Sequence, residues 1–598
     1  MPDAQVEARV TGMRFLIILL MAPLASSSQF PRRDAAAEPM TSSKSEPGPQ
    51  RPFRLLPDLL VVGTTLLICV PVLFYPLARD QGIFAYNTAA LLDGQTPYVD
   101  FTDQKPPGIF FLYAVPLLLF GRTMWGIHVF EWVWIAATAW AAWRVGRRFG
   151  GLTAGFVTGI LSGLFLSGAE APFYHRAEVE TFLTLPYAAI LALFLCPAGT
   201  SRPRTAVAAG LLSGACCCLK PNAIVFPILG AAVTILFDGL EHRSGRPLAA
   251  SLKTAACFAA GFTLLPASML AWLWSLGALG TFYEHMTSIN AAYLGNVWKE
   301  VIANFWYDSR VVISLGAGFL LLLFLVSRTG PANLRASLRG IFGPQGERKR
   351  RMVLVGALGA GSVAMVISGR HLFSYHYQIL VLPEALTIGL ALAGLAGPIV
   401  ARFRRRPAVR AAGMSLLCLG VISMVAANLK TQDISFFLGR QTLRAYHESR
   451  RFKLWRFFFR DDRMLADMLV ERTRPDERVQ ILGHGSLVLF LANRRSATRF
   501  SETTAALDPR YGRGGKDREE ILARLRQDPP RIIVVAEDQG QPQLDVAPTP
   551  RQIADFPPLA KFLEENYSPD EMVGHYKVLV LTARAQRGSS GAPRGAAR

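Results

Sequence analysis

Long apolar stretches recur along the chain up to Lys430, and short basic segments separate most of them. A helix needs about 20 predominantly apolar residues to cross the hydrocarbon core of a bilayer. About eleven stretches approach this length and are predicted as transmembrane helices. They lie at about 56–77, 126–146, 152–168, 181–197, 206–219, 221–237, 252–276, 310–327, 352–368, 376–397 and 409–428. We therefore predict a polytopic α-helical membrane protein whose helical domain covers residues 55–430.

The basic residues give these spans an orientation. They gather in alternate loops, and the richest loop follows the stretch at 310–327. It contains Arg328, Arg335, Arg339, Arg348, Lys349, Arg350 and Arg351. Lys and Arg are enriched in cytoplasmic loops. This rule predicts a cytoplasmic N-terminus and places everything after Lys430 outside.

One further apolar run, Pro106 to Phe120, is short and begins with two prolines. Counting it as a span would move every later basic loop to the outside, against the charge rule. We predict instead a helix that lies in the outer interface.

The net charge of +21 could indicate a nucleic-acid partner. The basic residues follow the positive-inside pattern, however, and no nucleic-acid motif accompanies them, so this class is excluded. All seven cysteines fall in apolar segments and are interpreted as small packing residues.

Three segments are set apart from the spans by composition. Residues 1–54 contain an apolar patch typical of a signal-peptide core, but cleavage there would leave several arginines outside. We predict a cytoplasmic, largely disordered leader. Residues 431–460 are basic and aromatic and suit an interfacial amphipathic helix, whereas the Arg-, Gly- and Ser-rich residues 585–598 should form a disordered tail.

Residues 461–584 alternate predicted helices with predicted strands. The helices are expected at about 461–473, 516–527 and 556–567, and the strands at Val479–Leu482, Arg531–Ala536 and Tyr576–Leu581. Alternation of this kind predicts a soluble α/β domain. The domain has no glycine-rich phosphate loop, and His484 with Gly485 after the first strand matches no motif.

The segment from Arg79 to Gly108, directly after the first span, has the densest candidate chemistry. It contains four carboxylates, with aromatic residues between them. These are Asp80, Asp93, Asp100 and Asp103. An ordinary solvated loop would have the same composition. A carboxylate at bilayer depth, however, is costly unless it has a partner or a function, and Asp80 lies at the mouth of the first span.

Three short motifs in this segment carry a family resemblance: Arg79-Asp80-Gln81-Gly82, Tyr98-Val99-Asp100-Phe101 and Lys105-Pro106-Pro107-Gly108. Weaker matches follow at Glu180-Thr181-Phe182-Leu183, at Lys220-Pro221 and around His371 to Pro383. From about residue 56 to 580 the chain resembles the bacterial protein-mannosyltransferase-like enzymes, which include the lipid A aminoarabinose transferases. The resemblance implies a GT-C membrane fold. It also implies transfer of a sugar from a polyprenyl-phosphate donor to a lipid, glycan or protein acceptor at the outer face of the bacterial inner membrane.

The resemblance implies a catalytic carboxylate. Asp80 is the candidate general base, which takes the acceptor proton while the hydroxyl attacks the anomeric carbon opposite the phosphate and inverts its configuration. Glu180 is the candidate second acid, with Glu178 as its rival; an interface or capping carboxylate is the alternative for either. The family pattern often has an acidic pair where this chain has Asp80-Gln81.

Three cations are candidates to bind the donor phosphate: Lys105, Lys220 and Arg370. Lys220 lies between two apolar spans, where an unpaired lysine is costly, although its side chain could instead reach the external headgroups.

Substrate contacts are expected from polar residues on the outer side. These are Tyr98, Asp100, Asp103, His175, His371 and Tyr375. Tyr375 could equally anchor the membrane interface, together with Tyr377. The motifs require no cofactor. A divalent metal held by His175, His371 and His376 with Glu180 is an alternative, but their spacing is not diagnostic, and lone histidines are more often structural.

Two other classes of function compete with the transferase. A secondary transporter or a flippase of lipid-linked sugars would also span the membrane many times. Such proteins tend to show internal repeats, and the Arg79–Gly108 pattern occurs once. A membrane-anchored binding protein would leave the loop carboxylates unexplained.

Overall fold

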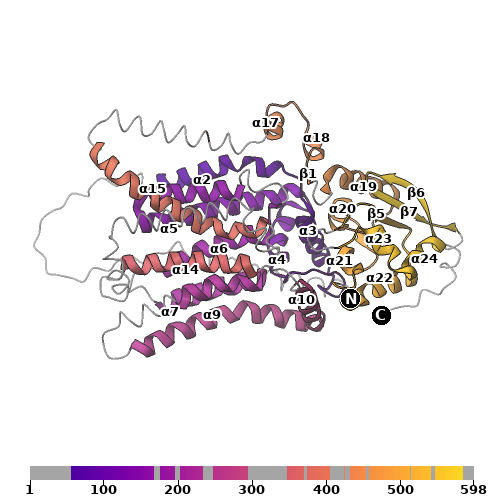
Figure 1. Cartoon of the computed structure of the whole chain (residues 1–598), viewed down its shortest axis with the longest axis horizontal. Coiled ribbons are helices and arrows are strands. Elements are labelled where there is room, and N and C mark those ends of the chain that lie inside the picture. The colour runs from indigo at the N-terminus through magenta and orange to yellow at the C-terminus, as the bar shows by residue number, and fades with distance from the viewer. Residues whose placement is uncertain are drawn as a thin grey trace, which may run out of the picture.

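The computed structural model describes residues 55–167, 175–195, 202–232, 247–293, 347–368, 374–403, 423, 431–452, 457–511, 513–540 and 546–583. These residues form a bundle of helices and, at one end of it, a domain that contains a β-sheet (Figure 1). The predicted leader and tail, the predicted span at about 310–327 and, except for residue 423, the predicted span at about 409–428 lie outside the described residues.

Most of the described helices of the bundle overlap the predicted spans, whereas those at 79–92, 108–120 and 279–293 correspond to none of them. Their bounds are α2 Leu56–Ile68, η2 Val70–Phe74, α3 Arg79–Leu92, α4 Gly108–Phe120, α5 Met124–Ser167, α6 Val179–Phe194, α7 Arg202–Leu219, η4 Pro221–Ile224, α9 Pro247–Ser275, α10 Leu279–Tyr293, α14 Glu347–Ser368, η6 Ser374–Leu380 and α15 Val381–Phe403. Of the described helices, three are long and apolar enough to cross a membrane: Met124–Ser167, Ser251–Ser275 and Tyr375–Gly394. The remaining apolar helices are shorter, so the count of eleven spans stays a prediction.

Two predicted boundaries have a clear local cause. Helix α5 contains both the second and the third predicted span, and its backbone leaves helical geometry at Gly150 and Gly151. The positive φ of 79° at Gly151 favours glycine, so the break that divides the two spans is encoded locally. The first predicted span is an α-helix only as far as Ile68 and continues as the 3₁₀ helix Val70–Phe74, which has a proline in its first turn.

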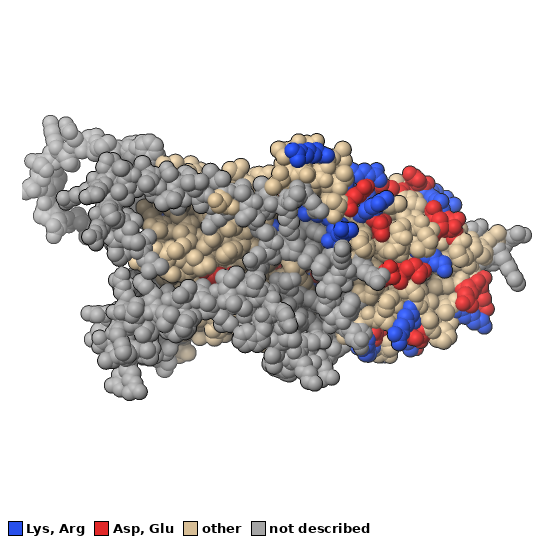
Figure 2. All heavy atoms as spheres, turned by 45° about the horizontal axis from the view of Figure 1, so that its top comes forward, with Lys and Arg blue, Asp and Glu red and all other residues tan. Residues whose placement is uncertain are grey.

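The outward side of the bundle is apolar. Large hydrophobic side chains are exposed on several of its helices, among them Leu59, Leu67, Leu252, Leu264, Trp274 and Leu392. On the face seen in Figure 2, the charged side chains of the described residues gather over the C-terminal domain. An apolar surface of this extent requires cover, and a bilayer supplies it.

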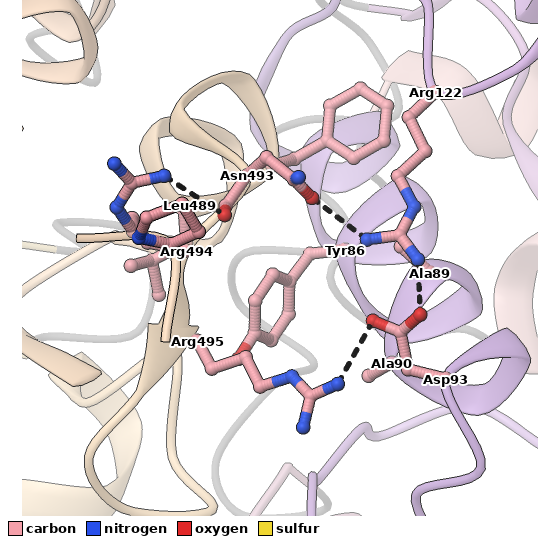
Figure 3. Close-up of a pocket in the computed structure, with 11 residues that line it drawn as sticks. Tyr86, Ala89, Ala90, Asp93, Arg122, Leu489, Asn493, Arg494 and Arg495 are labelled. Carbon is pink, nitrogen blue, oxygen red and sulfur yellow. Dashed lines mark hydrogen bonds and ion pairs between the residues drawn. The ribbon is translucent and has the colours of Figure 1, made fainter. Parts of the chain in front are cut away.

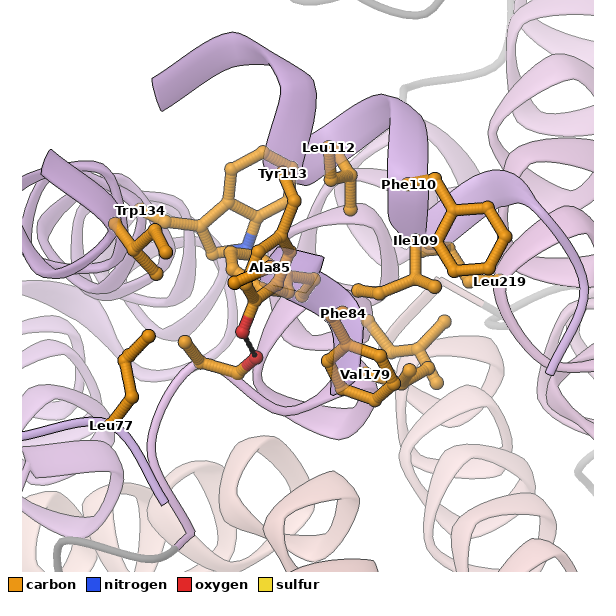
Figure 4. Packing of buried hydrophobic residues seen from close by; sticks show 14 of the residues in the cluster. Leu77, Phe84, Ala85, Ile109, Phe110, Leu112, Tyr113, Trp134, Val179 and Leu219 are labelled. Carbon is orange, nitrogen blue, oxygen red and sulfur yellow. Dashed lines mark hydrogen bonds between the residues drawn. The ribbon is translucent and has the colours of Figure 1, made fainter. Parts of the chain in front are cut away.

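Helices α3 and α4 lie where the bundle meets the C-terminal domain. Phe84 of α3 packs edge-on against Tyr113 of α4, with ring centroids 5.5 Å apart (Figure 4). The Tyr113 hydroxyl donates a 2.8 Å hydrogen bond to the carbonyl oxygen of Ala177, just before α6. The apolar run 106–120 is therefore a short helix packed into the end of the bundle.

The C-terminal domain is α/β, as predicted. Its elements are α19 Phe459–Arg472, β3 Arg478–Leu482, α20 Ser486–Ala492, β4 Arg495–Ser496, α21 Thr504–Leu507, η8 Arg513–Gly515, α22 Lys516–Gln527, β5 Ile532–Ala536, α23 Thr549–Ala554, α24 Pro557–Asn566, β6 Tyr567–Val573 and β7 Tyr576–Leu581. The strand order is β4-β3-β5-β7-β6. Strands β4, β3 and β5 are parallel, whereas β7 and β6 are antiparallel to their neighbours, and the β6–β7 register shifts between Pro569 and Met572.

Residues 431–460 differ from the single interfacial helix that we expected. They form α17 Thr431–Phe437, α18 Leu443–Glu448 and the two-residue strand pair β1 Arg451–Phe452 and β2 Phe457–Phe458. Two local signals divide the segment. Gly439 adopts a positive φ of 69° after α17, and the Thr442 side chain caps the N-terminus of α18.

The C-terminal domain packs directly on α3. A Cβ atom added at Gly82 would lie 2.6 Å from the Cβ atom of Leu487 in α20, so the two helices approach as closely as a glycine allows. The backbone N–H of Ser496 donates to the Tyr86 hydroxyl over 3.0 Å. These contacts attach the N-terminal part of α20 and the strand β4 to α3.

Candidate active site

Asp80 and Lys105 form an ion pair at the N-terminal end of α3. Lys105 Nζ lies 3.6 Å from Asp80 Oδ2, and both side chains remain partly exposed. The ammonium also lies 4.4 Å from the centroid of the Phe84 ring, one turn further along α3. The arrangement places a reachable carboxylate and a reachable cation side by side.

The position of Asp80 follows from the way in which α3 begins. Asp80 lies in the first turn, where a negative charge interacts favourably with the helix dipole. The adjacent Gln81 side chain accepts a 2.5 Å hydrogen bond from the backbone N–H of Ala78 and thereby closes the helix start. Asp80 is consequently fixed at a helix terminus that faces the Lys105 loop.

Lys105 is held by its own loop. Its backbone N–H donates to Asp103 Oδ1 over 3.0 Å, and its carbonyl oxygen accepts a 2.6 Å hydrogen bond from the Tyr98 hydroxyl. Asp103 is buried and also accepts from Asn87 Nδ2 over 3.0 Å. Burial raises the pKa of Asp103 to about 6. Burial alone would lower the pKa of Lys105, but Asp80 and the neighbouring carboxylates outweigh it and raise that pKa, so Lys105 stays charged.

Glu178, at the N-terminal boundary of α6, approaches the same place from the bundle. Gln81 Nε2 donates to Glu178 Oε1 over 3.0 Å. Burial and the charge of Asp80 raise the pKa of Glu178. The presence of Gln81 in place of a second acid therefore has a physical explanation. A carboxylate at position 81 would face the buried carboxyl group of Glu178, whereas the Gln81 amide donates a hydrogen bond to that group.

Glu180 is paired with Lys220. Lys220 Nζ lies 2.5 Å from Glu180 Oε1, and His376 Nε2 lies 3.7 Å from the same oxygen. The other carboxylate oxygen of Glu180 is buried and has no hydrogen-bond partner among the described residues, and the same holds for Glu178. Oxygens of this kind have capacity for a hydroxyl or amine that a ligand would supply.

The sequence interpretation missed one buried pair. Glu131 Oε1 accepts a 2.7 Å hydrogen bond from the backbone N–H of Ala177, and Glu131 Oε2 lies 3.0 Å from His128 Nδ1. Both side chains are on α5 and fully buried. They hold the segment that leads into Glu178. A carboxylate inside a predicted span is costly without a role, so Glu131 was detectable from the sequence.

The C-terminal domain also contributes to this region. Glu502 Oε2 lies 3.6 Å from Arg79 Nε and 2.7 Å from His484 Nδ1. Burial and the charge of Arg79 lower the pKa of His484 to about 4, while Glu502 partly opposes the shift. Burial would raise the pKa of Glu502, but the interactions with His484 and Arg79 lower it. No sequence signal linked positions 79, 484 and 502, because only tertiary structure brings them together.

The remaining predicted residues divide into three groups. Tyr98 is fully buried and packs on Phe282 with ring centroids 5.0 Å apart, and the exposed Asp100 accepts from the backbone N–H of Thr96, so both stabilise the loop. His175 is buried, and its ring centroid lies 5.8 Å from that of the half-buried Tyr375. The Tyr375 ring in turn packs against His376, which lies 3.7 Å from Glu180. Arg370 and His371 lie outside the described residues.

A metal site finds no support in the described part of the chain. There, no group of three or more His, Cys, Asp and Glu side chains is arranged to hold an ion. The metal alternative from the sequence also requires His371, which is not among the described residues.

The region as a whole combines a partly exposed carboxylate, two ammonium groups and buried carboxyl oxygens with unused capacity. Such a set can accept a proton from a hydroxyl, stabilise an anionic group and bind further hydroxyls. It lies at the junction between the apolar bundle and the charged domain (Figures 1 and 2).

Comparison with known proteins supports the same family. Residues 104–272 match the family described as dolichyl-phosphate-mannose-protein mannosyltransferase. No curated protein matches the chain. Among solved structures, the chain is similar to ArnT from Cupriavidus metallidurans bound to undecaprenyl phosphate, with 16% sequence identity, a TM-score of 0.52, and coverage of 89% of this chain and 99% of that chain.

The apo structure of the same enzyme matches with 15% identity and a TM-score of 0.51, covering 88% of this chain and 98% of that chain. These comparisons confirm the resemblance to the protein-mannosyltransferase-like and ArnT-like family, and they show that the chain has the GT-C fold.

Proposed function

From a GT-C fold with a carboxylate–lysine pair at the membrane junction, we propose that the protein is an inverting glycosyltransferase. It moves a sugar from a polyprenyl-phosphate donor to a hydroxyl of a lipid, glycan or protein acceptor. The observation that carries the proposal is the pairing of Asp80 with Lys105 at 3.6 Å, next to the buried acids of α6. The undecaprenyl phosphate named in the similar ArnT structure supports this class of donor.

The proposed reaction assigns one role to each member of the pair. Asp80 takes the proton of the acceptor hydroxyl as its oxygen forms a bond to the anomeric carbon. The bond from that carbon to the phosphate oxygen breaks on the opposite face, and its electron pair leaves with the polyprenyl phosphate. Lys105 stabilises the charge that develops on this phosphate. Attack from the face opposite to the leaving group inverts the anomeric configuration.

The α6 acids and their partners complete the site. Glu180, held by Lys220, and Glu178, held by Gln81, offer oxygens to the hydroxyls of the sugar. Lys220 is already paired with Glu180, so its contact with the phosphate would require the lysine to be shared between the two anions. Lys105 therefore serves as the principal phosphate cation.

The proposed location is the outer face of a bacterial inner membrane. A polyprenyl-phosphate sugar has its phosphate at the depth of the headgroups and its sugar in the aqueous phase. The Asp80–Lys105 pair lies between the apolar helices and a C-terminal domain whose surface is charged, which matches this division. The N-terminus is proposed to be cytoplasmic and the C-terminal domain extracytoplasmic.

The test follows release of polyprenyl phosphate from a panel of radiolabelled polyprenyl-phosphate sugars by the purified protein in nanodiscs. The wild type should turn over one donor of the panel, and Asp80→Asn should lower kcat by about 10²–10⁴-fold, because the asparagine cannot accept the proton. Asp467→Asn is the matched control, since Asp467 is an exposed carboxylate of α19 that is ion-paired to Arg463. It should retain wild-type turnover.

Two outcomes would contradict the proposal. Equal turnover by folded Asp80→Asn and wild-type protein would remove Asp80 from the role of base. Absence of turnover with every donor, together with passage of labelled lipid across reconstituted vesicles, would replace the transferase with a flippase.

A further inference from the structure

A polar cavity lies at the C-terminal end of α3, between the helical bundle and the C-terminal domain (Figure 3). Its volume is about 320 Å³. It is lined by the C-terminal end of α3, the connection between α4 and α5, and the turn from α20 to β4. The charged or amide-bearing residues that face it are Asp93, Arg122, Asn493, Arg494 and Arg495.

The guanidinium groups of Arg122 and Arg495 converge on the carboxylate of Asp93 (Figure 3). Arg122 Nη2 is ion-paired with Asp93 Oδ1, and Arg495 Nη2 lies 3.4 Å from Asp93 Oδ2. Arg122 Nη1 also donates to Asn493 Oδ1 over 2.7 Å. The side chains of Arg122 and Arg495 are 35% and 48% exposed, so solvent and ligands can reach both of them.

This arrangement has more donors than one carboxylate can accept. A guanidinium has five N–H donors in a planar fork. The contacts between described residues occupy two donors of Arg122 and one of Arg495. The pair therefore has excess positive charge and a cavity beside it. An ion pair that only joined the bundle to the C-terminal domain would need neither the excess positive charge nor the cavity.

Arg494 has a structural role at the base of the cavity. It is buried, and its Nε and Nη2 atoms donate to the side chain and the backbone carbonyl of Thr473, each over 2.7 Å. The preceding residue, Asn493, ends α20 in the left-handed conformation, with a φ of 49°. This anchored turn fixes the direction of Arg495 and of the Asn493 amide.

The residues that flank Arg122 in the sequence are apolar and exposed. Helix α4 ends in Leu118, Leu119 and Phe120, all exposed, and Leu119 is 69% exposed. Trp125, at the start of α5, is exposed as well and packs edge-on against Phe120 with ring centroids 5.5 Å apart. Arg122 lies between these apolar residues in the sequence. An arginine flanked by tryptophan and exposed leucines is typical of the headgroup level of a membrane.

We propose that this cavity is a binding site for the phosphate group of a lipid in the adjacent membrane surface. The planar forks of Arg122 and Arg495 suit bidentate contact with phosphate oxygens. The exposed apolar side chains of Leu119, Phe120 and Trp125, which flank Arg122 in the sequence, suit the upper part of the acyl chains. The site differs from the Asp80 region, because Asp93, the C-cap of α3, follows Asp80 by thirteen positions, which is a helical rise of about 20 Å. The proposed site is tested by lipid binding, so the result does not depend on whether the protein transfers a sugar.

The test is calorimetric titration of the purified full chain in detergent with dihexanoyl phosphatidic acid. The wild type should bind this lipid, and Arg122→Gln with Arg495→Gln should raise Kd by about tenfold or more. Arg472→Gln is the matched control: Arg472 is a similarly exposed arginine, ion-paired to Asp570 at the opposite edge of the same sheet, and its loss should leave Kd unchanged.

Asp93→Asn separates phosphate binding from a purely structural ion pair. Removal of the competing carboxylate should lower Kd about threefold, because both guanidinium groups become available to the phosphate. This variant also decides the matter if the double arginine variant fails to fold. An unchanged or raised Kd in Asp93→Asn, or equal binding by the double variant and the wild type, would overturn the proposal.

The source of the phosphate is decided by two further titrations. Dihexanoylglycerol, which lacks the phosphate, should not bind. Inorganic phosphate should bind at least about tenfold more weakly than the lipid, because it gains nothing from the exposed apolar residues that flank Arg122. Inorganic phosphate that binds as tightly as phosphatidic acid would overturn the assignment to a lipid.

Discussion

Lys105 is the residue on which the charge balance of the Asp80 region depends. Its ammonium faces Asp80 at 3.6 Å, and the neighbouring carboxylates raise its pKa against the effect of burial. A cation held in this way remains charged throughout the physiological range. It is therefore suited to a donor whose phosphate carries charge both before and after transfer.

Replacement of Lys105 by methionine keeps an unbranched stem beside Phe84 but removes the charge. We expect the KM for the polyprenyl-phosphate donor to rise by about tenfold or more, and Lys105→Arg to recover part of this loss, because a guanidinium can still pair with phosphate. Steady-state kinetics with varied donor concentration measure both effects. Lys561→Met, at a highly exposed position of α24, is the control. An unchanged donor KM in Lys105→Met would contradict the assignment.

At this scale the sequence located single residues but not their pairs. Asp80 and Lys105 belong to two separate motifs of one segment, and Glu131 was detectable as a carboxylate within a span. The pairing of Glu180 with Lys220, forty residues away, and that of Arg79 with Glu502 follow from helix packing and domain docking. No local pattern encodes such contacts. Tyr98 was expected to contact substrate, but its hydroxyl donates to the carbonyl oxygen of Lys105. The sequence gives no sign of this hydrogen bond.

Helix α3 is the element that joins the two parts of the molecule. Gly82 lies against Leu487, and a Cβ atom at position 82 would also come within 2.9 Å of the Leu487 Cα atom. Since backbone atoms cannot move aside as a flexible side chain would, a larger residue must separate α3 from α20.

We predict that Gly82→Ala destabilises the docked domain by about 1–3 kcal/mol, the usual cost of overpacking a close contact. The thermal unfolding midpoint of the purified protein should fall. Gly63→Ala is the control, because Gly63 is also helical and a Cβ atom there would have no neighbour within 4 Å. That change should be neutral or slightly stabilising. Equal midpoints for Gly82→Ala and Gly63→Ala would show that α3 and α20 can separate without cost.

The turn between β3 and α20 makes the docked state sensitive to acid. Burial and Arg79 lower the pKa of His484 from 6.5 to about 4. Between these values the unfolded chain binds a proton that the folded chain does not. The contribution of His484 is complete above pH 6.5 and is lost as the pH falls through this window, by at most about 1.4 kcal/mol per pH unit.

The thermal midpoint should therefore rise between pH 4.5 and 6.5, and His484→Gln should flatten that slope, because the amide can still donate to Glu502 but does not titrate. Midpoints measured at half-unit steps for both proteins test the prediction. Parallel slopes would assign the acid sensitivity to other groups.

Element prediction succeeded where periodicity was strong. Helices α19, α22 and α24 and strands β3, β5 and β7 agree with the sequence to within about two residues. Helix α20 was missed because its run SLVLFLA is apolar on all sides and short, so that it shows no period. Strand β6, YSPDEMV, was missed because an edge strand with one exposed face is polar and tolerates proline.

At the scale of the whole molecule, the open question for experiment is which side of the membrane holds the C-terminal domain. The charge rule places it outside, although residues 431–460 before it are basic. The similarity in fold to ArnT covers 89% of this chain and therefore extends over both the bundle and the C-terminal domain.

Single-cysteine labelling with a membrane-impermeant maleimide tests the orientation. Glu565→Cys, at an exposed position of α24, should be labelled in intact cells. Arg204→Cys, at an exposed position early in α7, should be labelled only after permeabilisation. The native cysteines lie in apolar segments, and the unmodified protein supplies the background. The reverse pattern would invert the proposed topology.

The irregular pairing of β6 with β7 affects whether the sheet of the C-terminal domain can pair with another molecule. β6 forms one border of the sheet, and its register shift falls between Pro569 and Met572. Proline has no N–H to offer a further strand, and the charged side chains of Asp570 and Glu571, both ion-paired with Arg472, occupy the same border. This border of the sheet is therefore poorly suited to pairing with the same border of a second copy of the chain.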